Sequence, residues 1–226
     1  MYITQAALRK DLSLATLSAI LRGGEYAAHQ HIWKLFQTEA DNQTRILFRR
    51  DDIGQWPRFL VVSSRPPEDT KNMWRIETKS YSPALKKGMR LAFSLRANPV
   101  VTRHDENGKQ KRDDVIMAHK KNLTAQNVPK REWPTSAELI QTIGVGWLAR
   151  RAENYGFSID QKQVIAEAYQ HHSYYKRGAK NPIIFSALDF NGLLIVDEPT
   201  LFQKALYGGI GPAKGFGCGM LMVRRV

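Results

Sequence analysis

The chain has 226 residues, 42% of them hydrophobic, and a formal net charge of +13 at pH 7. This apolar content suffices for a sizeable core, which excludes a disordered tail, and the length suits one domain or two small ones. The charge indicates a polyanionic partner, above all nucleic acid, with solubility alone as the weaker explanation. A single cysteine, Cys218, and the lack of a signal-like or membrane-spanning apolar run predict a cytoplasmic protein.

The N-terminal part of the sequence predicts strands and two helices. Residues 2–8 suit a short strand, and apolar residues over 12–21 recur at helical spacing until the Gly23-Gly24 pair. A second helix is expected over 25–37. Continuous or alternating apolar runs then predict four strands, at 45–50, 58–63, 74–78 and 89–95.

The middle of the chain is polar and basic. Residues 98–134 are rich in proline and glycine, which predicts a boundary or a mobile loop. The stretch from Lys71 to Glu132 holds fifteen Lys or Arg against six Asp or Glu, so most of the excess charge lies here, as a binding face requires. The expected organisation is an N-terminal domain, a basic linker and a C-terminal domain, over 1–98, 99–134 and 135–226.

The C-terminal part predicts helices that flank a long hairpin. The expected elements are a helix from Ser136, its expected N-cap, to Tyr155, strands over 164–175 and 182–190, a helix from Pro199 to Gly208 and a strand over 220–223. A basic tip over 176–180 joins the two strands, and Asn191-Gly192 predicts a hairpin turn after them. Each half reads as strand, helix and strands, which predicts an α+β fold of two tandem ferredoxin-like domains with antiparallel sheets.

Tyr26, His29 and Trp33 recur on one face of the second predicted helix. A phenol and an imidazole on adjacent turns suit proton transfer, because histidine titrates near neutral pH and is the commonest general acid or base. The competing interpretation is an aromatic stripe packed in a core, and the residues alone favour it. His31 lies roughly 200° from His29 around the helix, so the two histidines do not share a role.

Two further segments suit contact with phosphates. The end of the chain is rich in glycine, with Lys214 among Gly209, Gly211, Gly215, Gly217 and Gly219. Such glycines allow close backbone contact with a ligand or RNA, or simply form a flexible turn. The basic tip carries Lys176, Arg177 and Lys180 after two tyrosines, which suits phosphate contact and base stacking as well as a solvated turn.

The sequence offers no pattern of metal ligands. His171 and His172 are adjacent on a predicted strand and point to opposite faces, and clustered Cys, His or Asp motifs are absent. RNA cleavage by this chain would therefore use the 2′-hydroxyl of the RNA as nucleophile, with a base, an acid and a positive charge beside the phosphate. Tyr26, His29 and a nearby lysine are the candidates for these parts.

Several motifs together resemble the CasE-type CRISPR-associated endoribonucleases of the repeat-associated ferredoxin-like superfamily. They are Met1-Tyr2-Ile3, Tyr26-x-x-His29-x-x-x-Trp33, Leu95-Arg96-Ala97-Asn98-Pro99, Trp147-Leu148, Phe190-Asn191-Gly192, Gly209-Ile210-Gly211-Pro212-Ala213-Lys214 and Gly217-Cys218-Gly219. Their order covers nearly the whole chain, although the stretch 107–133 is longer and less matched than the family pattern.

The resemblance implies two tandem ferredoxin-like domains and metal-independent cleavage of CRISPR repeat RNA at the 3′ base of its stem-loop. It implies a cyclic phosphate product, no cofactor, and retention of the processed RNA among other Cascade subunits by a protein that is monomeric when free. It gives Tyr26 and His29 as the catalytic pair and the glycine-rich end as a signature loop. The expected RNA-binding residues are Arg96, Lys109, Lys111, Arg112, Lys176, Arg177, Lys180 and Lys214.

Two other functions compete with this one. A non-catalytic RNA-binding subunit of a CRISPR effector complex would share the fold and the charge but not the reactivity of the Tyr26–His29 helix. A metabolic enzyme that binds phosphate through its glycine-rich loop would bind a nucleotide and ignore hairpin RNA. The loop fails the pattern of a phosphate-binding P-loop, because Lys214 precedes glycine rather than Ser or Thr.

Overall fold

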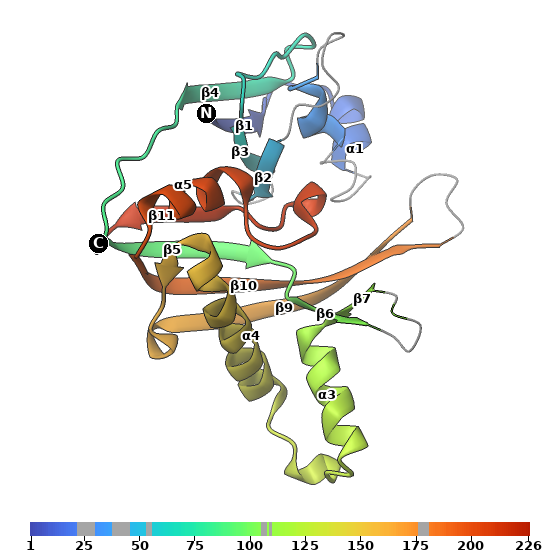
Figure 1. The fold of residues 1–226 in the computed structure, drawn as a ribbon. Helices are drawn as coiled ribbons and strands as arrows, with labels where there is room; N and C mark the ends of the chain where they lie inside the picture. Colours follow the sequence, from blue (N-terminus) through green and yellow to red (C-terminus); the bar gives the residue numbers. More distant parts are fainter. Residues whose placement is uncertain (22–29, 38–45, 53–55, 105–107, 109, 176–180) are drawn as a thin grey trace.

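The computed structural model describes residues 1–21, 30–37, 46–52, 56–104, 108, 110–175 and 181–226. Two antiparallel sheets lie one above the other in Figure 1, each with helices packed on it. The predicted α+β class with antiparallel sheets is confirmed. Within the described ranges, no helix has both the length and the apolar character needed to span a membrane.

The first sheet has the strand order β2-β3-β1-β4. Its strands are β1 (Tyr2–Leu8), β2 (Ile46–Arg50), β3 (Arg58–Ser63) and β4 (Trp74–Ser80), and α1 (Leu14–Leu21) follows β1. Residues 30–34 are also helical. Ile32, Leu35 and Phe36 are at most 4% exposed and join Phe59 and Trp74 in one core, so the second predicted helix packs on this sheet where it is described.

The second sheet has the order β11-β5-β10-β8, and β9 also pairs with β10. Its strands are β5 (Arg90–Ala97), β8 (Phe157–Ser158), β9 (Val164–Tyr174), β10 (Ile183–Val196) and β11 (Leu221–Arg225). The helices α4 (Ser136–Ala152) and α5 (Pro199–Gly208) pack on it. A Cβ on Gly144 of α4 would lie 2.6 Å from Leu188 Cδ2, so glycine allows helix and sheet to approach closely.

The sheet pairing of β5 differs from the expected division at residue 98. Every alternate residue of β5 from Leu91 to Ala97 is buried in the core of the second sheet, and the strand pairs with β10 and β11. Alternation predicts a strand but not its neighbours, because both sheets bury one face in the same way. We propose that the two domains divide between Ser80 and Arg90.

Residues 98–134, expected as a loop or linker, contain regular structure. They form the two-stranded hairpin β6 (Val100–His104) and β7 (Gln110–Asp114), the helix α3 (Val115–Ala125) and the 3₁₀ turn η1 (Lys130–Glu132). The prediction of a loop was wrong here because β7 has no apolar alternation and α3 buries only Val115, Ile116 and Ala118.

Two local predictions in the C-terminal half were also wrong. Asn191-Gly192 is not a turn, since β10 continues through it to Val196. A Cβ on Gly192 would lie 2.3 Å from the carbonyl oxygen of Gln163. This glycine therefore allows β10 to lie close to the backbone at the start of β9. The N-cap of α4 is Thr135 rather than Ser136, and it forms a reciprocal capping box with Glu138.

The two sheets share a small apolar patch formed by Leu47, Val62 and Met220, which are all at most 3% exposed. The hydroxyl of Tyr207 on α5 donates to the carbonyl oxygen of Tyr81 at 3.0 Å, which adds a polar contact at the same junction. The glycine-rich segment after α5 passes beside this patch, because Gly209 contacts Leu47. The junction therefore fixes the position of the N-terminal sheet relative to the glycine-rich end.

Candidate nucleic-acid interface

The predicted catalytic pair, Tyr26 and His29, lies outside the described residues. The structure does describe the helix immediately after it, whose buried side holds Ile32 in the first core. The opposite side carries His31 and Lys34, which line a pocket of about 430 Å³. The described helical residues after the predicted pair thus border a cavity.

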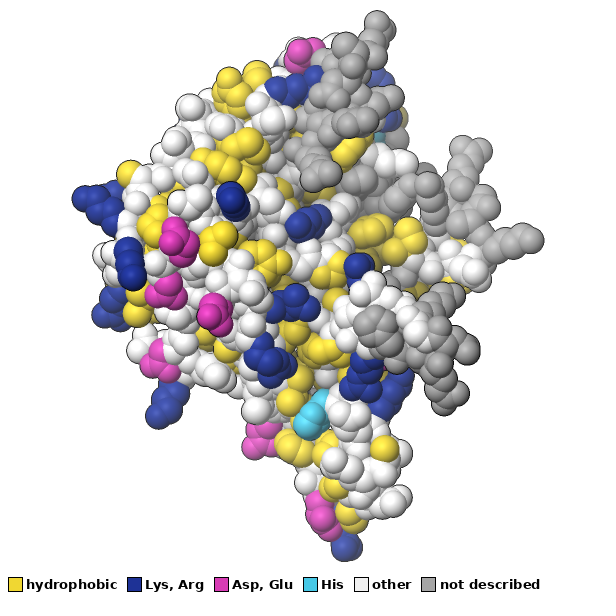
Figure 2. Space-filling view, in the orientation of Figure 1, with side chains coloured by type: hydrophobic (Ala, Val, Ile, Leu, Met, Phe, Trp, Pro, Cys, Tyr) yellow, Lys and Arg dark blue, Asp and Glu magenta, His cyan; other side chains and the backbone are white. Residues whose placement is uncertain are grey.

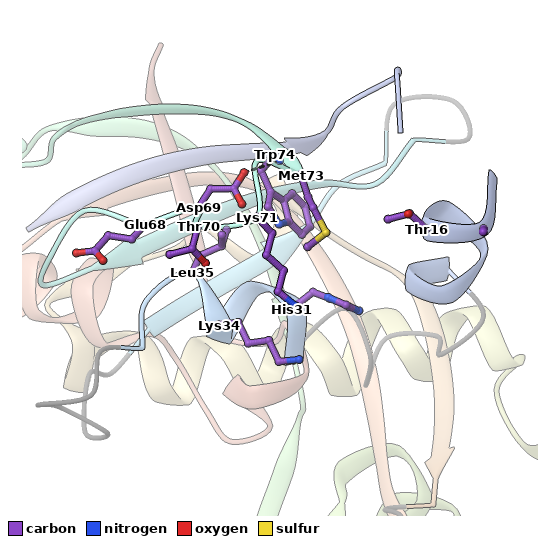
Figure 3. A pocket seen from close by; sticks show the side chains of 11 residues that line it. Thr16, His31, Lys34, Leu35, Glu68, Asp69, Thr70, Lys71, Met73 and Trp74 are labelled. Carbon is purple, nitrogen blue, oxygen red and sulfur yellow. Dashed lines mark hydrogen bonds between the residues drawn. The ribbon is translucent and has the colours of Figure 1, made fainter. Parts of the chain in front are cut away.

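This pocket gathers charged side chains from two segments distant in sequence (Figure 3). Lys71 extends from the loop before β4 towards His31 and Lys34. Glu68 and Asp69 come earlier in the same loop and also line the pocket. Burial, and then the positive charges of Lys34 and Lys71, lower the pKa of His31 below its ordinary 6.5. His31 is therefore neutral at pH 7, and the two lysines supply the positive charge of the pocket.

Sequence reasoning did not single out Lys34 or Lys71. Lys34 had an available signal, because it follows His31 by three residues and so lies on the same side of the helix. Lys71 had none, since only the folding of the loop before β4 brings it to this helix.

The basic residues of the β6–β7 hairpin are exposed. Lys111 pairs with Arg103 across the hairpin and Arg112 pairs with Thr102, and both Lys111 and Arg112 are open to solvent. Figure 2 shows a run of Lys and Arg side chains that crosses the centre of this face and reaches the hairpin and the start of α3. Lys109, Lys176, Arg177 and Lys180 lie outside the described residues. Lys111 and Arg112, the two predicted RNA contacts that the structure describes on this hairpin, therefore suit contact with a polyanion.

Arg96 makes a contact that the sequence did not indicate. Its guanidinium donates to both carboxylate oxygens of Asp189, at 2.7 and 2.8 Å, and so links β5 to β10. Arg49 lies near this pair and donates to Ser94 Oγ at 2.9 Å. Burial lowers the pKa of Arg49, and the charge of Arg96 acts in the same direction while Asp189 opposes it. The Arg96–Asp189 pair thus adds a side-chain link between two strands that already pair through their backbones.

The glycine-rich segment packs within the chain along most of its length. Gly209, Gly217 and Gly219 are buried, Gly211 is half-buried, and Gly215 alone among the five predicted glycines is exposed. Lys214 lies in the 3₁₀ turn η4 (Lys214–Phe216), and its Nζ donates to the carbonyl oxygen of Gly208 at 2.5 Å. This segment is an ordered loop with one short helical turn.

Four rings connect the β9–β10 hairpin to this loop. His172 and Tyr174 on β9, Phe185 on β10 and Phe216 in η4 contact one another with ring-centroid separations of 5.0 to 5.9 Å. His171 faces a different neighbour, Ser186 Oγ, at 3.3 Å. Among the described residues, no three His, Cys, Asp or Glu side chains lie close enough to hold a metal ion.

The fold and the charge distribution define a class of two-sheet α+β proteins with a basic face over the second sheet. A family model described as CRISPR associated protein matches residues 1–225, and the chain belongs to this family. The chain is 31% identical over 201 residues to the CRISPR-associated endoribonuclease Cse3 of Thermus thermophilus, with 81% of each chain covered. It is 29% identical over 199 residues to the Cascade subunit CasE of Escherichia coli K12, with 87% of this chain and 89% of the relative covered.

Solved structures agree with this assignment. The endoribonuclease Cse3 bound to a 19-nucleotide RNA matches with a TM-score of 0.69 and 25% identity, covering 99% of this chain and all of the other. The CRISPR-associated protein Cas6e of Escherichia coli K-12 matches with a TM-score of 0.60 and 23% identity over the whole of both chains. The second match extends the likeness of fold to the Escherichia coli protein.

Proposed function

We propose that this protein is an endoribonuclease that cuts precursor CRISPR RNA and retains the product within a Cascade-type effector complex. The observation that carries the proposal is the match along nearly the whole chain to the endoribonuclease Cse3, in sequence and in its RNA-bound structure. The relative named as a Cascade subunit supports the assembly. The exposed cations of β7 and the net charge of +13 suit a protein that holds RNA.

The proposed reaction uses the nucleophile within the RNA itself. A base at the Tyr26–His29 pair removes the proton of the 2′-hydroxyl, and the 2′-oxygen attacks the adjacent phosphorus. The bond from phosphorus to the 5′-oxygen breaks, and an acid of the same pair protonates that oxygen, leaving a 2′,3′-cyclic phosphate and a 5′-hydroxyl. A nearby lysine stabilises the charge on the phosphate.

Replacing His29 tests this function directly. His29→Ala should reduce cleavage of a repeat stem-loop RNA by about 10² to 10⁴, because it removes one proton-transfer group. RNA affinity should change little, since the cationic surface is intact. The measurements are single-turnover cleavage and equilibrium binding with the same labelled RNA.

His119→Ala is the matched control, because this histidine lies on α3, and it should cut at the normal rate. Normal cleavage by His29→Ala would reject the catalytic assignment. RNA binding without cleavage by the unaltered protein would identify a non-catalytic RNA-binding subunit. Affinity for a free nucleotide combined with indifference to hairpin RNA would instead indicate a metabolic enzyme.

A further inference from the structure

A second cavity, of about 420 Å³, lies at an open edge of the second sheet. β5 pairs with β10 only from Leu188 onwards, so no described strand pairs with Ile183–Ala187 on the side opposite β9. The cavity lies against this edge and is closed by Asn98, the end of β7 and the loop that carries Phe216. Backbone donors and acceptors of β10 therefore border a pocket of small-molecule size.

The lining of this cavity carries more negative than positive charge, whereas the chain as a whole is strongly positive. Asp113 and Asp114 contribute two carboxylates to its lining, and Arg112 contributes one guanidinium. Asp114 already accepts a hydrogen bond from the Met117 amide at 2.8 Å as the N-cap of α3. Asp113 is half-buried, and no described donor bonds to its carboxylate. A phosphate would meet net negative charge here, whereas a neutral group with N–H donors would meet an available acceptor.

The remaining lining suits a flat aromatic ligand. Phe216 and Phe185 supply ring surface, and Ile183 and Ile184 supply aliphatic surface on the strand edge. The side chain of Asn98 is 7% exposed, and its Oδ1 has no hydrogen-bond partner among the described residues. An aromatic wall, an acceptor carboxylate and an open backbone edge are the features with which proteins bind unpaired nucleobases.

We propose that this cavity binds one unpaired base of the RNA and prefers guanine. Guanine presents adjacent N1–H and N2–H donors to the Asp113 carboxylate, whereas uracil presents a single N–H between two acceptors. The sugar and phosphate remain outside, where Arg112 is exposed on β7. The inference rests on the proposed RNA-processing function and adds a specificity site to it, distant in sequence from Tyr26 and His29.

Nucleosides test the site without phosphates and without cleavage. The full-length protein, labelled with ¹⁵N, is titrated with guanosine, inosine, adenosine, cytidine and uridine while the amide signals of Ile183–Ser186 are followed. Guanosine should shift these signals with a dissociation constant about tenfold below that of uridine, the effect of one hydrogen bond to a charged group. Inosine, which lacks the 2-amino group, should bind between the two.

Asp113→Asn should lose the preference for guanosine, because an amide offers a weaker acceptor and adds donors. Asp197→Asn, at an exposed aspartate after β10, is the matched control and should keep the preference. Equal binding of all nucleosides, no response at Ile183–Ser186, or an unchanged preference in Asp113→Asn would overturn the proposal. So would a response of these amides only to a partner subunit, since the open edge would then bind a protein strand.

Cleavage of a repeat stem-loop RNA by the same protein is measured in parallel. Normal cleavage without any nucleoside response removes the base site and leaves the proposed function standing. Failure to bind or cut the RNA removes the proposed function itself, and guanosine selectivity would then no longer report on an RNA site.

Discussion

At the scale of single residues, the glycine-rich end shows what a sequence motif leaves open. Its composition suited close contact with a ligand or RNA, a flexible turn, or both. The structure shows contacts within the chain: a Cβ on Gly209 would lie 2.7 Å from Leu47 Cδ1 and 2.9 Å from the carbonyl oxygen of Gly219. Gly209 also has φ of +73°, a conformation that other residues adopt at a cost. Composition left close contact and a flexible turn both open, and it gave no sign that the neighbour is the first sheet.

Gly209→Ala should therefore lower the free energy of unfolding by about 2 to 4 kcal/mol, from backbone strain and from overpacking against Leu47. Gly208→Ala is the matched control, since its Cβ would meet nothing within 4 Å. That change should leave stability within about 1 kcal/mol, as expected for alanine at an unstrained helix position. Urea denaturation measures both variants, and equal stabilities would show that the loop does not depend on Gly209.

The half-buried imidazole of His31 predicts a dependence of stability on pH. Burial, Lys34 and Lys71 lower its pKa in the folded protein below 6.5, so the unfolded chain binds the proton first as the pH falls. The contribution of His31 to the free energy of unfolding should therefore be lost as the pH falls below 6.5. His31→Gln should lose less stability between pH 7 and pH 5 than the unaltered protein. Parallel losses in urea denaturation at the two pH values would contradict this assignment.

At the scale of elements, hydrophobic periodicity predicted those strands and helices that bury one face. β1, β3, α4 and α5 lie within a few residues of their predicted ranges. The β6–β7 hairpin escaped prediction because Gln110–Asp114 is entirely polar and only backbone pairing makes it a strand. The same polar character leaves Lys111 and Arg112 exposed, which is what an RNA-binding element requires.

Lys111→Ala should weaken RNA binding and reduce the slope of log affinity against log salt by about 0.7, the value for one single-strand phosphate contact. Lys162→Ala is the control, in the 3₁₀ turn η3 (Gln161–Gln163) before β9. It should change neither quantity, because η3 lies at the start of β9, far from the tip of the β9–β10 hairpin and from β7 (Figure 1). Titrations at several salt concentrations measure both variants. An unchanged slope in Lys111→Ala would remove β7 from the RNA-binding surface.

At the scale of the whole molecule, the sequence predicted individual strands but not which strands pair with one another. β5 alternates as β1 does, yet it joins β10 because its buried residues complete the larger core. The shared patch of Leu47, Val62 and Met220 then fixes the two sheets together. The pocket lined by His31 and Lys34 also forms only through tertiary structure, since Lys71 reaches His31 only in the folded chain. Sequence similarity supplied the candidate catalytic pair, whereas only folding brings Lys34 and Lys71 together around His31.

The most direct test of this account follows the products of cleavage in the presence of EDTA. With a labelled repeat RNA, the protein should cut at an undiminished rate and leave a 2′,3′-cyclic phosphate and a 5′-hydroxyl. A single 2′-deoxy substitution at the nucleotide 5′ of the cut should abolish cleavage while the RNA still binds. Cleavage that requires added magnesium, or that continues past the 2′-deoxy nucleotide, would contradict attack by the 2′-hydroxyl.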